Sequence, residues 1–210
     1  MEIDRLIALF EREQKNAEEM EKIREMRAAA DPRKRISYTV EELAKGIKGG
    51  KLYLYTLKLH FEPREILGGR IRIPFIQNCF DIMEEMQYHE LCISQKRKIS
   101  LLSACAPSGE PGDFQTWAEK VKDGVELSGL KLKNLQFRSA GLIDYMIYEV
   151  ASAEGLIYNI HFRFWKDACI YTGVWNCMEE EKDGWGRLLE AMFHVMGEMN
   201  CQEGGGHGIE

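Results

Sequence analysis

The sequence predicts an α+β fold in which helices cover an antiparallel sheet as an α/β/α sandwich, with a charged helical extension at the N-terminus. Three observations support this prediction. Apolar and polar residues alternate in many short segments, the connections between these segments are short, and segments of helical periodicity stand before, within and after them. Strands joined in this way must be antiparallel, because a parallel return needs a crossover of about a dozen residues or more. The helices then have to cover the faces of the sheet.

The composition fits one domain with a single core. The chain has 210 residues, of which 45% are hydrophobic and 10% aromatic, which is enough for one substantial core. We expect three parts: an N-terminal helical extension over residues 1–35, a single α+β domain over 36–200, and a flexible tail over 201–210.

The charge balance narrows the classes of partner. A formal net charge of −6 and a pI near 5.5 disfavour nucleic acid, because nucleic-acid binders usually carry a basic surface. No apolar run reaches the roughly 18 residues of a membrane span, and the start does not resemble a secretory leader. We therefore expect cytoplasmic residence without membrane association. The six cysteines are then expected to be reduced thiols. None forms a CxxC pair and no histidine lies at ligand spacing from another cysteine, so we expect no structural zinc site. We also expect no cofactor.

Two helices are expected before the first strand. Residues 2–29 have apolar residues at helical spacing near both ends and a charged middle, which predicts one charged helix. Such a helix buries little against its own domain, so it either projects to form a homodimer or meet a partner, or lies on the surface held by its apolar ends. Thr39 and Glu42 have capping-box spacing and Gly49 closes the segment, so a second, short helix is expected between them.

The remaining elements follow in order along the chain. Alternation predicts one strand over residues 51–61 and another over 70–75, whereas 79–90 is ambiguous. Residues 91–106 indicate two strands joined by a basic turn, and Asp113 is expected to cap a helix over 113–127. Four more candidate strands lie between 134 and 177, and a closing helix is expected over about 182–199.

The last two strands are rich in aromatic residues, and their register decides what they can do. A two-residue turn at Lys166 and Asp167 would place Trp165 opposite Ala168 and Phe164 opposite Cys169. The face that carries Phe164 and Cys169 is then apolar throughout, which indicates a wall of the core. His161 falls on the other face, so it cannot activate Cys169 as a nucleophile.

The second face of this hairpin is mixed in character and supplies the candidate binding residues. Asn159, His161, Arg163 and Trp165 would form a shallow polar and aromatic binding face if no helix covers them. In the alternative, a helix does cover them, Arg163 extends its guanidinium to water, and His161 bonds with Thr172. The sequence leaves both possibilities open.

No pattern in the sequence predicts a catalytic residue. Asp144 and Glu149 are five residues apart, so on one strand they point to opposite faces and cannot work as a pair of carboxylates. The GGR segment at residues 68–70 lacks the lysine and the hydroxyl residue of a phosphate-binding loop. We expect a protein without enzymatic activity.

The order of elements from about residue 70 onward resembles the PsbP/DcrB-like sandwich superfamily. The resemblance rests on an early strand RIRIPF, a mid-chain helix GDFQTWAEKVKDGVEL, the strands from LIDYMIYEV to IYTGVWNC, and a final helix WGRLLEAMFHVMGEM. It covers about two thirds of the chain and is a resemblance of pattern. It implies a protein whose sheet face or edge docks another protein, as the effector-associated chaperones of type VI secretion in this superfamily do.

Three functional hypotheses follow. The first is a cytoplasmic protein-interaction module, an accessory protein or chaperone for a secreted effector, with an exposed apolar patch. The second is an immunity-type inhibitor that binds a basic toxin through an acidic surface, so that its association would be sensitive to salt. The third is a small-ligand binder that uses the mixed face with His161 and Arg163.

Overall fold

The computed structural model describes residues 38–110 and 112–201. The predicted helix 2–29, the proposed extension 1–35 and nearly all of the predicted tail 201–210 therefore lie outside the described residues.

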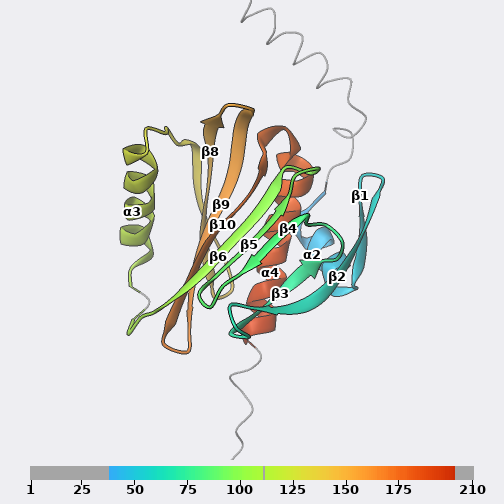
Figure 1. The fold of residues 1–210 in the computed structure, drawn as a ribbon, viewed down its shortest axis with the longest axis horizontal. Coiled ribbons are helices and arrows are strands. Elements are labelled where there is room, and N and C mark those ends of the chain that lie inside the picture. Colours follow the sequence, from blue (N-terminus) through green and yellow to red (C-terminus); the bar gives the residue numbers. More distant parts are fainter. Residues whose placement is uncertain (1–37, 111, 202–210) are drawn as a thin grey trace, which may run out of the picture. The chain divides into compact units, whose positions relative to one another are not determined.

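Two antiparallel sheets make up most of the described structure (Figure 1). The smaller sheet has the order β1-β2-β3, with β1 Lys51–Leu54, β2 Leu57–Ile66 and β3 Ile71–Ile76. The larger, seven-stranded sheet has the order β4-β5-β6-β10-β9-β8-β7. Its strands are β4 Ile82–Glu85, β5 His89–Ser94, β6 Ile99–Pro107, β7 Lys133–Ala140, β8 Ile143–Ser152, β9 Gly155–Lys166 and β10 Cys169–Met178.

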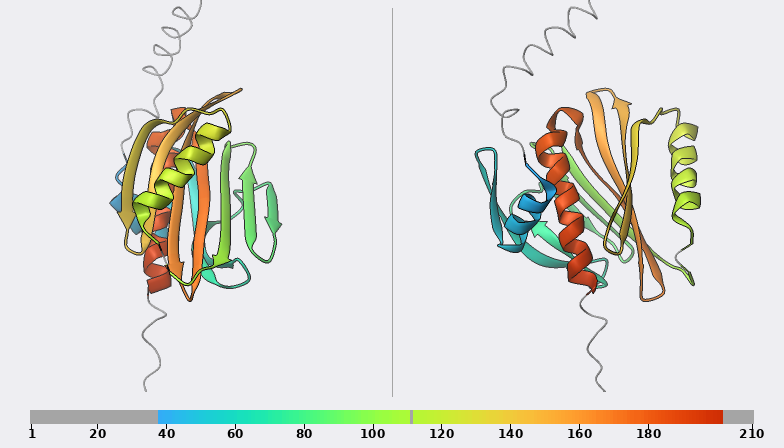
Figure 2. Two further views of the ribbon diagram at one scale, coloured as in Figure 1. Left: turned by 90° about the vertical axis from the view of Figure 1, so that its left-hand side faces the viewer. Right: turned by 180° about the vertical axis from the view of Figure 1, so that it is seen from behind.

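Helices lie on both faces of the seven-stranded sheet (Figures 1 and 2). Helix α4, Arg187–Cys201, packs on one face, and α2, Val40–Lys48, and the smaller sheet lie on its far side. Helix α3, Phe114–Leu127, lies on the opposite face. The predicted α+β fold, an antiparallel sheet covered by helices, is confirmed.

The core lies between the seven-stranded sheet and α4 and is built from stacked aromatic rings. The Phe193 ring on α4 lies 4.5 Å from the Trp175 ring and 5.0 Å from the Phe162 ring, centroid to centroid, and it also stacks on Tyr145. Gly173 makes room for them, because a Cβ there would lie 2.6 Å from the Phe162 ring and 2.2 Å from the carbonyl oxygen of Leu102. The apolar hairpin face is thus a wall of the core.

The smaller sheet corrects one prediction, since residues 51–61 form two strands rather than one. The chain turns at Tyr55 and Thr56, so that Leu54 lies opposite Leu57. Tyr55 takes a positive φ of 55°, and its ring packs edge-on against Tyr38 at 5.7 Å. This turn lacks the glycine or asparagine that marks such turns in a sequence, which is why alternation alone missed it.

The predicted register of the aromatic hairpin is also wrong, by one residue in the turn. Lys166 pairs with Cys169, and Asp167 and Ala168 form the turn with φ of 51° and 56°. Two positive φ values are those of a type I′ turn, whose twist matches that of the flanking strands. This match outweighs the unfavourable positive φ of Ala168. Each partner moves by two positions, so Phe164 lies opposite Tyr171 and both faces keep their predicted residues.

The helix boundaries agree with the prediction except before α4. The Thr39 and Glu42 capping box at the start of α2 is confirmed, as is Asp113 at the cap of α3. The closing helix begins as a 3₁₀ turn, η2 Glu179–Glu181, and a π-helical turn, η3 Lys182–Gly186, before α4. Gly184 in η3 lies against the Tyr55 ring, where a Cβ would be 2.0 Å from the hydroxyl oxygen.

Candidate functional site

The four residues of the predicted binding face lie on the side of the sheet that α3 occupies, and α3 covers most of them. Ala118 of α3 packs with Met146, Tyr148 and Val150 of β8, and the helix extends over β9 (Figure 2). Asn159 and Arg163 are each only 6% exposed. At Asn159 and Arg163 the structure thus has the covered face that the sequence left as one of two possibilities.

His161 lies in an aromatic pocket beneath α3. The Trp117 ring meets its imidazole edge-on at a centroid distance of 5.3 Å, and Tyr148 lies at 6.5 Å. Burial lowers the pKa of His161 to about 4, so the ring is neutral at physiological pH. Its sheet neighbour is Val174, and Thr172 instead lies opposite Arg163, so the predicted pairing of His161 with Thr172 is wrong.

Arg163 holds the start of α3 in place. Its guanidinium donates to the carbonyl oxygens of Asp113 at 3.0 Å and Gly112 at 3.2 Å, and it forms an ion pair with Asp144 at 3.5 Å. It also lies over the Phe114 ring, 5.3 Å from the centroid. The side chain is therefore a buried anchor for the loop that enters α3 and does not extend into water.

Trp165 is the most exposed of the predicted site residues, with 38% of its surface exposed. Its indole nitrogen donates to the carbonyl oxygen of Ser108 at 3.2 Å. Together with Leu142, Ile170 and the stem of Arg163 it borders a hollow of about 220 Å³.

Next to Trp165, the same side of the sheet continues over β10, β6 and β5, where no helix of the described residues covers it (Figure 2). The strand pairings place Val174, Leu102 and Leu91 in one row across these three strands. Leu102 is 42% exposed and its neighbours are partly exposed. We call the following set the uncovered apolar strip: Leu91, Ile93, Leu102, Ala106, Ile170 and Val174.

The two halves of this sheet side have an inverted polarity. Asn159, His161 and Arg163 on β9 lie under α3, whereas the apolar strip beside them faces outward. A buried polar residue and an exposed apolar patch are the informative departures from ordinary burial. The sequence analysis missed the strip because alternation does not show that β5 and β6 lie next to β10.

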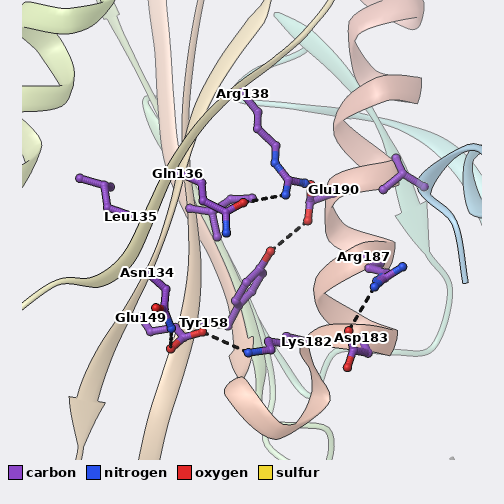
Figure 3. A pocket seen from close by; sticks show the side chains of 12 residues that line it. Asn134, Leu135, Gln136, Arg138, Glu149, Tyr158, Lys182, Asp183, Arg187 and Glu190 are labelled. Atoms are coloured by element: carbon purple, nitrogen blue, oxygen red, sulfur yellow. Dashed lines mark hydrogen bonds and ion pairs between the residues drawn. The ribbon is translucent and has the colours of Figure 1, made fainter. Parts of the chain in front are cut away.

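On the opposite side of the sheet, a polar cleft of about 540 Å³ opens between β7, β8 and the start of α4 (Figure 3). Glu190 of α4 lies at its centre and is 3% exposed. Its carboxylate accepts hydrogen bonds from Arg138 of β7 and from the Tyr158 hydroxyl at 2.9 Å. Burial, and then the Glu190 charge, raise the pKa of Tyr158, so the phenol remains protonated and donates.

A second buried carboxylate lies in the same cleft. Glu149, 4% exposed, accepts from the Asn134 amide at 2.7 Å and forms an ion pair with Lys182 of η3 at 3.3 Å. Asp144 pairs with Arg163 on the other side of the sheet, so Asp144 and Glu149 point to opposite faces as predicted. The cleft could not be predicted from the sequence, because its polar residues come from β7, β8, η3 and α4 at irregular spacing.

The cysteines are free thiols, and all except Cys201 are buried. Burial raises the pKa of Cys79 and of Cys92 to about 11, which keeps both protonated near neutral pH. Among residues 38–110 and 112–201, no cluster of three histidine, cysteine or acidic side chains is placed to hold a metal ion. No helix in this part of the chain is long and apolar enough to cross a membrane.

Comparisons with known proteins show a distant likeness of fold. No family model matches the sequence, and no curated protein matches it either. Among solved structures the chain is similar to the solution structure of cyanobacterial PsbP (CyanoP) from Synechocystis sp. PCC 6803. The two share 9% sequence identity and a TM-score of 0.46, over 66% of this chain and 90% of that chain.

Proposed function

We propose that this protein is a non-enzymatic protein-interaction module that binds an amphipathic helix of a partner protein on the uncovered apolar strip. The observation that carries this proposal is the inverted polarity of the α3 side of the sheet. Leu91, Leu102 and Val174 face outward in one row, whereas the polar residues of β9 are buried under α3. An apolar strip of this kind is stabilised when a second apolar surface displaces water from it.

The dimensions of the strip favour a helix as the bound element. Neighbouring strands lie about 4.8 Å apart, so β5, β6 and β10 together span about 10 Å, which is close to the diameter of a helix. Successive rows are two residues apart along a strand, about 6.6 Å. The strip extends from the row of Ile93 to the row of Ala106 and includes a mixed row of His89, Ala104 and Thr172. Its length is about 20 Å, which a helix of about three to four turns matches. Such a helix would lie beside α3 on the same side of the sheet.

The chemistry of the strip favours apolar contact as the source of affinity. A partner with an amphipathic helix is what an accessory protein or chaperone for a secreted effector would bind, and this is the partner class that we propose. Association through Leu102 and Val174 would be insensitive to salt, because it releases water rather than ions. An immunity-type inhibitor that uses acidic residues would instead lose its toxin partner as salt rises.

A site-specific photocrosslink tests the proposal. A photoreactive amino acid is placed at Leu102 of the full chain in cells of the source organism, and mass spectrometry identifies the crosslinked peptide. We expect one partner whose crosslinked segment is apolar on one helical face, with a yield that is unchanged at high salt. The yield should fall at least tenfold when Val174→Asp is added.

The matched control is Leu127→Asp, since Leu127 is a leucine on α3, 88% exposed and outside the strip. This change should leave the crosslink intact. A crosslink to a second copy of this chain would replace the proposal with a homodimer interface. Absence of any crosslink, or a yield indifferent to Val174→Asp, would overturn it.

A further inference from the structure

The polar cleft between β7, β8 and α4 lies on the other side of the sheet from the strip (Figure 3). Its charged side chains form two layers that differ in exposure to solvent. The inner layer consists of Glu190 and Glu149, whose side chains are 4% and 5% exposed. The outer layer consists of Arg138 and Lys182, whose side chains are 44% and 38% exposed. Arg138 and Lys182 are therefore more accessible than the two carboxylates that they pair with.

A third cation, Arg187, lines the same cleft from the first turn of α4. Its guanidinium donates to the carbonyl oxygen of Tyr38 at 2.6 Å and to Asp183 at 3.3 Å. Asp183 is the only acidic side chain of the cleft that is mostly exposed, at 64%. The accessible charges at the cleft are thus the three cations, Asp183, and Glu179 at its border, which is 25% exposed and pairs with Lys182 at 2.6 Å.

The cations keep hydrogen-bond donors beyond those that hold them in place. An arginine has about five N–H donors. The bonds of Arg138 to Glu190 and Gln136, and those of Arg187 to Tyr38 and Asp183, each use two. Lys182 has about three donors and directs two of them to Glu149 and Glu179. The buried carboxylates position the cationic groups, so little side-chain freedom is lost when they bind an anion.

The walls between the charged groups are partly apolar. Val40 of α2, Leu135 of β7 and Ile147 of β8 line the cleft together with the Tyr158 ring. A volume of about 540 Å³ is within the range of small-molecule sites, where apolar walls surround a few placed polar groups. Neither buried carboxylate lies free to pair with a cationic ligand, since both already accept from protein donors.

We propose that this cleft binds a small organic anion, whose carboxylate or phosphate group is held between Arg138 of β7 and Lys182 of η3. The Tyr158 ring and Ile147 contact the apolar body of the anion. The site is independent of the proposed partner helix, because the two surfaces lie on opposite sides of the seven-stranded sheet. Both carboxylates and phosphates accept hydrogen bonds from these donors, and the experiment separates them.

The test is titration of the full chain with benzoate and with phenyl phosphate, which share an apolar ring and differ in the acid group, at constant ionic strength, followed by calorimetry and by the melting temperature. We expect saturable binding of one of the two anions and a rise in melting temperature that follows the occupancy. Selective binding of benzoate assigns the carboxylate class, and selective binding of phenyl phosphate assigns the phosphate class. Arg138→Gln and Lys182→Gln should each weaken the dissociation constant at least tenfold.

Lys98→Gln is the matched control, because Lys98 also pairs with a carboxylate, Glu154 at 2.7 Å, but lies outside the cleft. It should leave binding unchanged. Since Arg138→Gln removes the cation beside the buried Glu190, the amide spectrum of the unmodified chain is also recorded during the titration. Shifts confined to residues of β7, η3 and the start of α4 support the site. No saturable binding, dispersed shifts, or an equal effect of Lys98→Gln would overturn it.

Discussion

The two faces of the seven-stranded sheet are built in opposite ways. The α4 face is a continuous aromatic core in which Phe193, Trp175 and Phe162 are each at most 1% exposed. The α3 face carries a single helix in which only Ala118 is fully buried, and this helix covers polar side chains of β9. The difference indicates that the fold is stabilised mainly from the α4 side, and it is the reason why we propose the α3 side for binding.

Removal of the central ring of the α4 face should give the largest effect. Phe193→Ala leaves a cavity among three aromatic neighbours, so we expect the free energy of unfolding to fall by about 3–5 kcal/mol. Urea unfolding monitored by circular dichroism measures this value. A loss below that of any α3-face variant would reverse the comparison of the two faces.

Acidification should weaken the α3 face through His161. Its pKa is about 4 in the fold against 6.5 in the unfolded chain, so the unfolded state binds more protons as pH falls from 6.5. Stability is then lost through this window, by about 2 kcal/mol between pH 7.5 and 5. The facing groups are Trp117 of α3, Tyr148 of β8 and Val174 of β10, and none of them is charged in this range.

The measurement is the difference in unfolding free energy between the natural chain and His161→Phe at each pH, because the titration of other groups cancels. A difference that stays constant from pH 7.5 to 5 would mean that His161 keeps its ordinary pKa and that α3 does not shield it.

Replacement of Trp117, whose ring covers His161, tests the burial of His161 with a smaller loss of stability. Trp117 is only partly buried, so Trp117→Ala should lower stability by about 1–2 kcal/mol, less than a core aromatic does. It should also raise the pKa of His161 toward 6.5, because the imidazole regains water. The pH dependence of the imidazole proton shifts in the NMR spectrum gives the pKa. An unchanged value would show that β8 alone buries the ring.

The strip should give the smallest effect on stability. Leu102→Asp replaces a side chain that is 42% exposed, so the free energy of unfolding should change by no more than about 0.5 kcal/mol. With the photoreactive amino acid placed at Val174 instead, in the same row, the same substitution should abolish the crosslink to the proposed partner helix. A stability loss similar to that of Phe193→Ala would place Leu102 in the core and remove the basis for the strip.

Periodicity predicted the sheet class, the positions of most strands and the caps of α2 and α3, because each of these depends on local pattern. The split of residues 51–61 was missed because the turn at Tyr55 is held by the Tyr38 ring, a contact between separate elements. The two faces of the aromatic hairpin were predicted correctly although its turn was not, since a shift of two positions keeps each side chain on its face.

The candidate site was less predictable than the fold. Asn159, His161 and Arg163 were predicted to form a binding face if no helix covered them, and the position of α3 decides this condition. The polar cleft joins Glu149 and Glu190 with Arg138, and only the packing of α4 on β7 and β8 brings them together. Cytoplasmic residence, the partner class and the role of residues 2–29 stay predictions.

The strand order has a consequence for how the chain folds during synthesis. Strands β7 to β10 form consecutive hairpins, so they can pair as soon as they emerge, whereas β6 has to wait for β10. Until Cys105 meets Tyr171, the earlier strands β4, β5 and β6 have a free edge and no aromatic core behind them. Pairings distant in sequence slow folding, so the joining of β6 to β10 is the step at which a nascent chain is most open to aggregation.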